Sequence, residues 1–405
     1  MEIKGLSDDN ILKISHIKEE DEWALKYRID SYHNFLKLGL PDFGPKIELD
    51  FDNIIYYKSR QESEIKNNWN DINCSVKNEL DNLGVLESEK HLDGIGVQYE
   101  SEVIYHNMLS ELEEKNVIFT SIEVAMKKYP ELVKKYFGKI VSNNENKFAA
   151  LNGAVFSGGS FIYIPPNTTL DRPLQSYFRI NSRNMGQFER TLIIVDDNSH
   201  LHYVEGCTAP TYSDSSLHAA VVEIYVGKNS SCRYSTIQNW APNVYNLVTK
   251  RALVDENGVM EWIDGNIGSR LTMKYPCCVL KGDNSKGTCI TISVASKTQE
   301  QDSGARMIHL GKNTTSNIIS KSIAQSGGNS TYRGKVRITK GATGSSAMVK
   351  CDTLILDSIS KSDTIPVNIC ENESSNIEHE ATVSKISEDN LYLSLIHISE
   401  PTRPY

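Results

Sequence analysis

The chain has 405 residues, a formal net charge of −9 and 39% hydrophobic residues, which is enough for two or three globular domains. Acidic and basic residues are interspersed, so no basic surface for nucleic acid is indicated. No apolar run approaches the roughly 18 residues of a membrane span, and the first residues are too acidic for a secretory signal. We therefore expect a cytoplasmic protein, or one of a plastid-type organelle in a eukaryote, with neither nucleic acid nor membrane as partner. Its eight cysteines should be thiols.

Helical periodicity dominates the first 148 residues, which we expect to form a mixed, largely helical N-terminal domain. Capping side chains at 7–10 precede an apolar run at 11–17 and predict a first helix. Aromatic and aliphatic residues at 23–39 predict a second helix. Further helices are predicted at about 101–114 and 121–136.

The composition changes near residue 150, where short β-branched runs replace the helical pattern. Examples are the segments 161–164, 192–195 and 220–226, each bounded by Gly, Asn, Asp or Ser. Such runs between turn-forming residues are typical of β-strands. The region from 149 to 392 is therefore expected to be mainly β.

The turns of this region repeat with a nearly constant period. A small polar residue, usually Asn, follows each apolar strand end, with spacings of 27 to 31 residues. The marker positions are Asn167, Asn198, Asn229, Asn257, Asn284, Asn313, Thr343 and Asn372. A period near 29 without helical pattern is too short for propeller blades and indicates a parallel β-helix. Asn suits its corners because it tolerates left-handed backbone angles.

A β-helix places residues at equal offsets from successive markers above one another. Cys207, Gln238 and Asn266 each stand nine residues after a marker, which predicts a polar ladder. Cys351 and Glu380 each stand eight residues after theirs, which predicts a thiol–carboxylate pair with Cα atoms roughly 5 Å apart. The carboxylate would then raise the pKa of the thiol.

Simpler interpretations stay open for most of these residues. A lone Cys in a strand is most often a small buried hydrophobe, and we expect this of Cys74, Cys232, Cys289 and Cys370. Alternation along a strand sends the adjacent pair 277–278 to opposite faces. The segment 378–380 could equally be a polar, solvent-exposed edge of the sheet. Trp240 could simply cap the hydrophobic core.

Several enzyme motifs are missing from the sequence. There is no GxxxxGK[ST] phosphate loop, so the chain is not itself a P-loop ATPase, and no GxSxG, HExxH or GxGxxG occurs. We expect a non-enzymatic protein. The alternative from another class is a β-helix polysaccharide lyase or hydrolase, for which Asp196 and Asp197 are the tempting carboxylate pair.

Ten short blocks carry a resemblance to a known family and together are very specific. They include Glu205–Pro210 with its cysteine, Gln238–Trp240, and Glu378–Thr382. The others are the segments 96–102, 146–152, 178–181, 186–191, 246–251, 280–283 and 330–334. Over roughly residues 1–392 the chain resembles the SufB branch of the SufB/SufD family, which builds iron–sulfur clusters. SufD, a structural paralogue that bears no cluster, is the second alternative.

The resemblance implies a right-handed parallel β-helix between helical end domains, acting as an assembly scaffold. It implies as partners a SufC ATPase, a SufD or second SufB chain, and a cysteine desulfurase with a SufE- or SufU-type carrier. The cargo would be a transient 4Fe–4S or 2Fe–2S cluster, with FADH2 as a possible reductant in the complex.

The resemblance also assigns roles to residues of this chain. Cys207 matches the sulfur entry point. Cys351 matches the cluster-assembly thiol, with Glu380 and His379 as further cluster or metal ligands. Positions proposed to line a sulfur-transfer path are matched by Arg179, Asn181, Gln238, Trp240 and Lys250. Arg179 and Lys250 would supply positive charge to the transferring thiol.

The C-terminal end departs from the family. Residues 393–405 resemble translated sequencing adapter, and the family's C-terminal helical domain is expected to be missing. Because the family's ATPase-docking surface lies in that domain, we expect this chain to bind its ATPase partner poorly. We also expect the last coil to fray without a cap.

Overall fold

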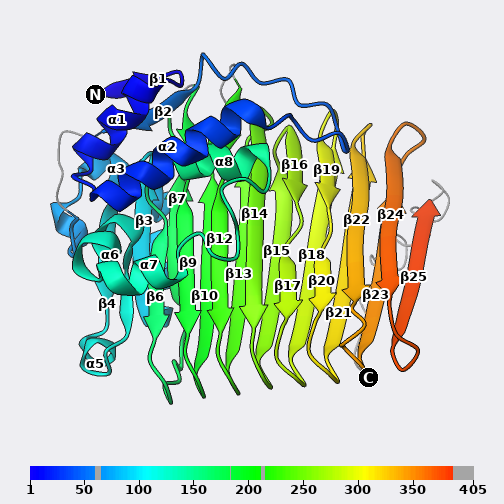
Figure 1. The fold of residues 1–405 in the computed structure, drawn as a ribbon. Coiled ribbons are helices and arrows are strands. Elements are labelled where there is room, and N and C mark those ends of the chain that lie inside the picture. The colour runs from blue at the N-terminus through cyan, green and yellow to red at the C-terminus, as the bar shows by residue number, and fades with distance from the viewer. Residues whose placement is uncertain (60–64, 183, 211–214, 386–405) are drawn as a thin grey trace, which may run out of the picture.

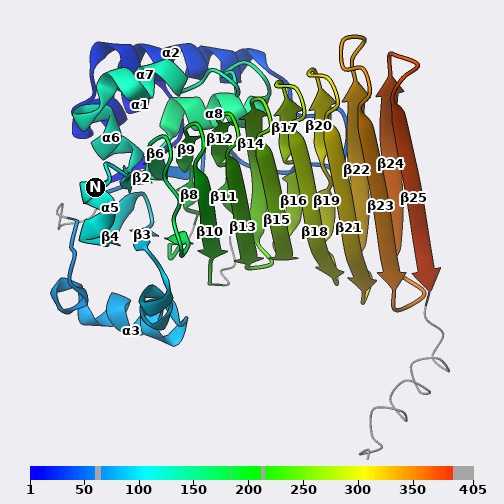
Figure 2. The same ribbon diagram turned by 90° about the horizontal axis from the view of Figure 1, so that it is seen from below.

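The computed structural model describes residues 1–59, 65–182, 184–210 and 215–385. A long parallel β-solenoid fills most of the molecule, and helices cover its N-terminal end and one side (Figure 1). The same arrangement seen from below shows α3 on the opposite side from α1, α2 and α7 (Figure 2). The predicted parallel β-helix is confirmed. The expected adapter-derived tail at 393–405 and the predicted solenoid end at 386–392 lie outside the described residues.

The N-terminal elements are mostly helices. The α-helices are α1 (Asp8–Ile17), α2 (Glu22–Lys37), α3 (Cys74–Asn82), α4 (Val85–Ser88), α5 (Ser110–Glu114), α6 (Ile122–Lys128), α7 (Pro130–Tyr136) and α8 (Lys147–Val155), with 3-10 turns at Trp69–Asp71 and Glu89–His91. Ser7 caps α1 by accepting a hydrogen bond from the N–H of Asn10. The helix predicted at 121–136 is divided at Tyr129, because Pro130 begins a new helix and disfavours helical angles before it.

The helix predicted at 101–114 is wrong over most of its length. The chain forms strand β4 (Glu102–Met108), which pairs antiparallel with β3 (Gly94–Tyr99) across a turn where Glu100 has a φ of 58°. β3 in turn pairs with the first long solenoid strand. Pairing with the exposed edge of β3 therefore outweighs the helical spacing of a segment whose Val103, Ile104 and Tyr105 also favour a strand. The sheet begins well before residue 149.

Two long sheets form the walls of the solenoid. Beyond β3 and β4, the ten-stranded sheet contains β7 (Leu174–Arg179), β10 (His200–Thr208), β13 (Ser231–Trp240), β15 (Val259–Gly268), β18 (Lys286–Ser296), β21 (Thr315–Gln325), β23 (Ser346–Ile355) and β25 (Asn376–Lys385). The thirteen-stranded sheet contains β5 (Ile118–Ser121), β6 (Ser160–Ile164), β8 (Gly186–Gln187), β9 (Arg190–Val195), β11 (Ser216–His218), β12 (Val221–Val226), β14 (Val244–Val254), β16 (Leu271–Lys274), β17 (Cys277–Leu280), β19 (Glu300–Ser303), β20 (Arg306–His309), β22 (Asn329–Ile338) and β24 (Lys361–Cys370). A separate antiparallel pair is made by β1 (Glu2–Lys4) and β2 (Ile55–Lys58).

The asparagine markers stack along one edge, as the period predicted. Each of the six from Asn167 to Asn313 has a left-handed backbone with φ between 54° and 59°. Their side chains form a ladder in which Asn198 donates to Asn167 at 3.1 Å and Asn229 donates to Asn198 at 3.2 Å. The ladder continues through Asn257 and Asn284.

The last two markers do not occupy that corner. In the next coil the left-handed residue at this corner is Gly344 (φ 71°). At each earlier corner the N–H of a marker donates to the carbonyl of the residue just before the next marker, and the N–H of Asn313 likewise donates to the carbonyl of Thr343. One coil later, β23 and β25 pair with a 30-residue offset, which places Ser374 at the corner. Thr343 is therefore one residue early and Asn372 two residues early.

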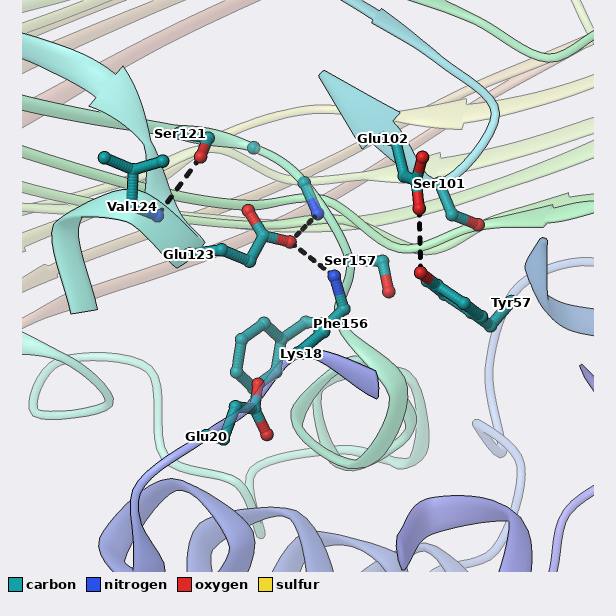
Figure 3. A network of polar contacts seen from close by, with 12 residues as sticks. Lys18, Glu20, Tyr57, Ser101, Glu102, Ser121, Glu123, Val124, Phe156 and Ser157 are labelled. Carbon is teal, nitrogen blue, oxygen red and sulfur yellow. Dashed lines mark hydrogen bonds and ion pairs between the residues drawn. The ribbon is translucent and has the colours of Figure 1, made fainter. Parts of the chain in front are cut away.

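Buried ion pairs attach the helices to the first coils. Lys18 after α1 contacts Glu123 of α6 at 2.8 Å, and the same carboxylate accepts from the N–H of Gly158 at 2.5 Å. Figure 3 shows Glu123 held between these groups. Burial opposes ionisation of Glu123, but Lys18 and the Gly158 N–H lower its pKa overall. Arg28 of α2, paired with Glu20, adds hydrogen bonds to backbone carbonyls at the end of α8.

No helix among the described residues is long and apolar enough to cross a membrane.

Candidate functional site

Cys207 lies inside the solenoid near the carboxyl end of β10. Parallel pairing places it beside Gln238 of β13, and Gln238 beside Asn266 of β15. All three side chains are at most 1% exposed. The predicted polar ladder is therefore confirmed in register and in direction.

Glu205 accompanies Cys207 on the inner face and was not predicted as a site residue. The thiol of Cys207 donates to a Glu205 oxygen at 3.7 Å, and the hydroxyl of Tyr234 donates to the other oxygen at 2.5 Å. Residues i and i+2 of a strand share a face. The spacing Glu-Gly-Cys was thus the signal that could have found this base.

Two lysines and two carboxylates lie beside this thiol in the interior. The ammonium of Lys250 is 3.8 Å from both Glu205 and Asp264, and that of Lys274 is 3.3 Å from Asp264. The four formal charges cancel. Burial opposes ionisation of Asp264, yet Lys274 and Lys250 lower its pKa overall, while burial lowers the pKa of Lys274. Lys250 was predicted here; Asp264 and Lys274 were not, because nothing local in the sequence links β15 to β16.

The pKa of the Cys207 thiol is well above its usual range. Burial is the main cause, and the charges of Glu205 and Glu189 add to it, while Lys250 and Lys274 oppose it. Arg179 was expected to supply positive charge to this thiol, but it is not among the groups that lower the pKa of Cys207. Its side chain points to the outer face, where it binds Glu79 at 2.9 Å, because Phe178 takes the inward position beside Cys207.

A hydrogen-bonded chain leads from the ladder to the neighbouring wall. Asn246 donates to the Gln238 carbonyl oxygen at 2.7 Å, and His218 bonds Asn246 at 2.8 Å and Glu189 at 2.9 Å. The Trp240 ring lies 4.7 Å from the His218 ring. Gln238, Trp240 and Lys250 thus lie near Cys207. Asn181 lies at the rim of this end of the solenoid and bonds the hydroxyl of Tyr99.

Two inward columns run from this end of the solenoid to Cys351. One column contains Glu205, Thr236, Asp264, Thr291, Ser320 and Cys351, and the other contains Cys207, Gln238, Asn266, Ser293, Ser322 and Thr353. Cys351 therefore stands in the column of Glu205, five inter-strand steps or about 24 Å away. Every member of both columns is polar or a thiol.

The interior also contains buried polar atoms that have no hydrogen-bond partner among the described residues. They include Nε2 of Gln238, both amide atoms of Asn266, Oδ2 of Asp264 and Nε1 of Trp240. Buried polar atoms normally have a partner. Gln238, Asn266 and Asp264 belong to the two columns, so the columns have unused hydrogen-bonding capacity.

Cys351 and Glu380 are not the neighbouring pair that was predicted. Cys351 pairs with Ala381, and Glu380 pairs with Lys350. The two misplaced markers shifted the predicted register by one residue, and a shift of one residue turns a side chain to the opposite face of the sheet. Glu380 is solvent-exposed and lies 3.3 Å from the Lys350 ammonium.

His379 is the residue that approaches Cys351. Its Nε2 lies 3.9 Å from the Cys351 sulfur, and the thiol is 3% exposed. Burial raises the pKa of Cys351 to about 12, Tyr332 opposes that shift, and Asp352 adds to it. Glu380 is not among the causes, contrary to expectation. Burial lowers the pKa of His379, which favours the neutral imidazole.

All eight cysteines are free thiols, as expected. Cys232 and Cys289 are buried in the apolar core, which confirms their simpler interpretation. Cys74 and Cys370 are exposed, so that interpretation is wrong for them. Cys278 faces the core, whereas Cys277 faces outward between Arg251 and Arg306 on the flanking strands, as alternation predicted. The described residues contain no group of three or more His, Cys, Asp or Glu able to hold a metal ion.

Comparison with known proteins agrees with this architecture. Residues 178–394 match the family described as "SUF system FeS cluster assembly, SufBD core domain", and residues 97–176 match the "SufBD protein N-terminal region". A Staphylococcus saprophyticus protein named as an iron–sulfur cluster assembly SufBD family protein is 55% identical over 400 residues, which is 98% of this chain and 86% of that protein. A Staphylococcus aureus (strain USA300) protein of the same family name is 54% identical over the same shares. The chain therefore belongs to the SufBD family of iron–sulfur cluster assembly proteins.

Proposed function

We propose that this chain is a SufB-type scaffold that accepts sulfur at Cys207 and assembles a nascent cluster at Cys351. The observation that carries the proposal is the pair of polar columns that connect the two thiols through the solenoid. A purely structural paralogue would have no need for a buried thiol with its own carboxylate base and two lysines at one end. The SufD-like alternative is therefore less favoured.

Sulfur acceptance would begin with deprotonation of Cys207. Glu205 accepts the thiol proton at the 3.7 Å contact, and Lys250 and Lys274 offset the negative charge of the thiolate. The thiolate attacks the outer sulfur of the donor persulfide, so a Cys207 persulfide forms and the donor leaves as a thiolate. No electron is gained or lost in this exchange.

Onward movement of sulfur needs a different chemistry. Between Cys207 and Cys351 the two columns contain hydroxyls, amides and Asp264 but no thiol. We therefore propose that sulfur travels as hydrosulfide. Its release converts the Cys207 persulfide, two electrons and one proton into a thiol and one hydrosulfide ion, and FADH2 bound in the complex would supply the electrons.

Assembly at the far end would use Cys351 and His379 as ligands from this chain. Thiolate and imidazole are both established ligands of iron–sulfur clusters. With no larger ligand group in the described residues, the remaining ligands come from a partner. Glu380 faces away from Cys351, so we assign it no contact with that thiol.

The partners proposed are a SufC ATPase, a SufD or second SufB chain, and a cysteine desulfurase with its SufE- or SufU-type carrier, all in the cytoplasm. The chain itself is proposed to have no enzymatic activity. Uronate chemistry is not favoured, because Asp196 and Asp197 lie on a solvent-facing turn and are engaged in structural hydrogen bonds.

Sulfur labelling tests the acceptance step. After incubation with desulfurase, carrier and [35S]cysteine, we expect label on the peptide that contains Cys207, and loss of nearly all label in Cys207→Ser. The matched control is Cys232→Ser, also a fully buried thiol on the inner face of the same sheet, which should keep the label. Equal labelling of the two variants would contradict the proposed entry point.

A further inference from the structure

A cavity on the outer face of the thirteen-stranded sheet has no role in the function proposed so far. Its volume is about 470 Å³, and its walls come from β14, the start of α8 and the strap, which is the chain at 38–54 between α2 and β2. Figure 1 shows the strap extending along the solenoid toward β22 and returning to β2. The cavity is within the size range of small-molecule sites.

Much of the cavity wall is apolar or aromatic. The Phe43 ring of the strap lies 6.1 Å from the Tyr275 ring of the sheet, measured between centroids, and so ties the strap to the wall. The Arg333 guanidinium adds a cation–π contact, 5.0 Å from the centroid of Phe43. The other apolar wall residues are Leu38, Leu40, Pro41, Leu247 and Met273.

Arg306 on this wall is a cation without an acidic partner. Its neighbours Arg251 and Arg333 each bind a carboxylate. In the part of the chain that the structure describes, the half-buried Arg306 side chain has no ion pair or hydrogen bond, and its guanidinium lies 5.4 Å from the Tyr275 ring centroid. A guanidinium held against a ring can present its N–H groups to both oxygens of an acid.

The other charged groups of the wall also favour an anion. Both oxygens of Glu145 are bound by Arg251, and the Lys147 ammonium donates to two backbone carbonyls at the end of α2, each at 2.8 Å. Asp42 is exposed on the strap, and the Lys250 side chain points into the solenoid. Three cations therefore outnumber two acids among the side chains around the cavity.

We propose that this cavity binds a small organic acid with a flat apolar body. Its carboxylate or phosphate group pairs with Arg306, while the body lies against Phe43 and Tyr275. A single inorganic anion would leave most of the roughly 470 Å³ unfilled, and an uncharged compound would leave Arg306 without a partner. Because the cavity lies outside the solenoid, the inference does not depend on the proposed path of sulfur.

Titration calorimetry of the full chain with three naphthalene probes tests the proposal. The probes 1-naphthyl phosphate and 1-naphthoate carry the two acid groups, and 1-naphthamide has the same ring without a charge. We expect an acid to bind at one site per chain, about tenfold or more tighter than the amide. The tighter acid identifies the group that the site prefers. Arg306→Gln should weaken that acid by about tenfold or more and leave the amide unchanged.

Arg337→Gln is the matched control, because Arg337 belongs to the same sheet but pairs with Glu371 away from the cavity. It should bind the probes as the wild type does. Arg306→Lys keeps the charge but loses the planar fork, so it should bind the acid more weakly than the wild type. The proposal is overturned if neither acid binds at about 5 mM, if the amide binds as tightly as the acids, or if folded Arg306→Gln keeps wild-type affinity. If Arg306→Gln does not fold, wild-type affinity in Arg306→Lys overturns it.

Discussion

Cys351→Ser is expected to abolish cluster formation while the fold stays intact. The thiolate is the ligand that iron–sulfur clusters prefer, and Cys351 is the thiol at the far end of the column that begins at Glu205. Serine has nearly the same shape, but its hydroxyl is a much harder ligand and is rarely ionised. Anaerobic reconstitution with desulfurase, its sulfur carrier and iron should give less than about a tenth of the wild-type absorption and iron content.

Cys232→Ser is the matched control for this experiment. Its sulfur is fully buried in the apolar core, and burial accounts for most of its raised pKa. The same thiol-to-hydroxyl exchange should leave the cluster yield near wild type. A normal yield in Cys351→Ser would remove this thiol from the mechanism, whatever the control does.

Asp264→Asn is expected to destabilise the protein by about 3–5 kcal/mol. The Asp264 side chain is fully buried and lies within 4 Å of the ammonium groups of Lys250 and Lys274. Neutralising it leaves two buried lysines with one carboxylate, Glu205. A double variant with Lys274→Met restores the balance of charge and should recover most of the loss. Urea denaturation followed by circular dichroism measures both.

The pH dependence of stability gives a second measurement for Asp264. Its folded pKa lies below the ordinary Asp value, so its contribution is present above that value and is lost as the pH falls through the folded pKa. The acid side of the stability curve should therefore be flatter in Asp264→Asn. For comparison, Glu261→Gln breaks a partly exposed pair with Arg233 and should cost about 0–1 kcal/mol. Equal stability of the wild type and Asp264→Asn would contradict the predicted loss.

The fold was predictable because its physical cause is local and repeats. Each corner needs a left-handed residue, and Asn both tolerates that angle and bonds the next Asn in the ladder. Six markers therefore gave the period and, through it, the adjacency of Cys207, Gln238 and Asn266. The segment 101–114 was mispredicted because its strand depends on pairing with β3, which its own sequence does not reveal.

The site was only partly predictable for a related reason. Thr343 and Asn372 look like markers, but the left-handed corner of the later coil belongs to Gly344, and this one-residue error exchanged His379 for Glu380 as the neighbour of Cys351. Lys274 and Asp264 lie on opposite walls and meet across the interior. Which residues meet across the interior depends on how far apart the two sheets lie, and the spacing of the markers carries no information about that distance. The resemblance to the family pointed to Cys207 and Cys351, and the structure shows which residues surround them.

The variable corners of the solenoid have a consequence for how such a protein can change length. Coils of 27 to 31 residues keep the inner columns aligned, because extra residues enter the corners and leave the strand register unchanged. The separation of Cys207 and Cys351 is therefore counted in coils rather than residues. Duplication of a whole coil would lengthen that separation by about 4.8 Å and keep every side chain facing its original direction. A single residue inserted within a strand would instead move every following side chain of that strand to the opposite face of the sheet.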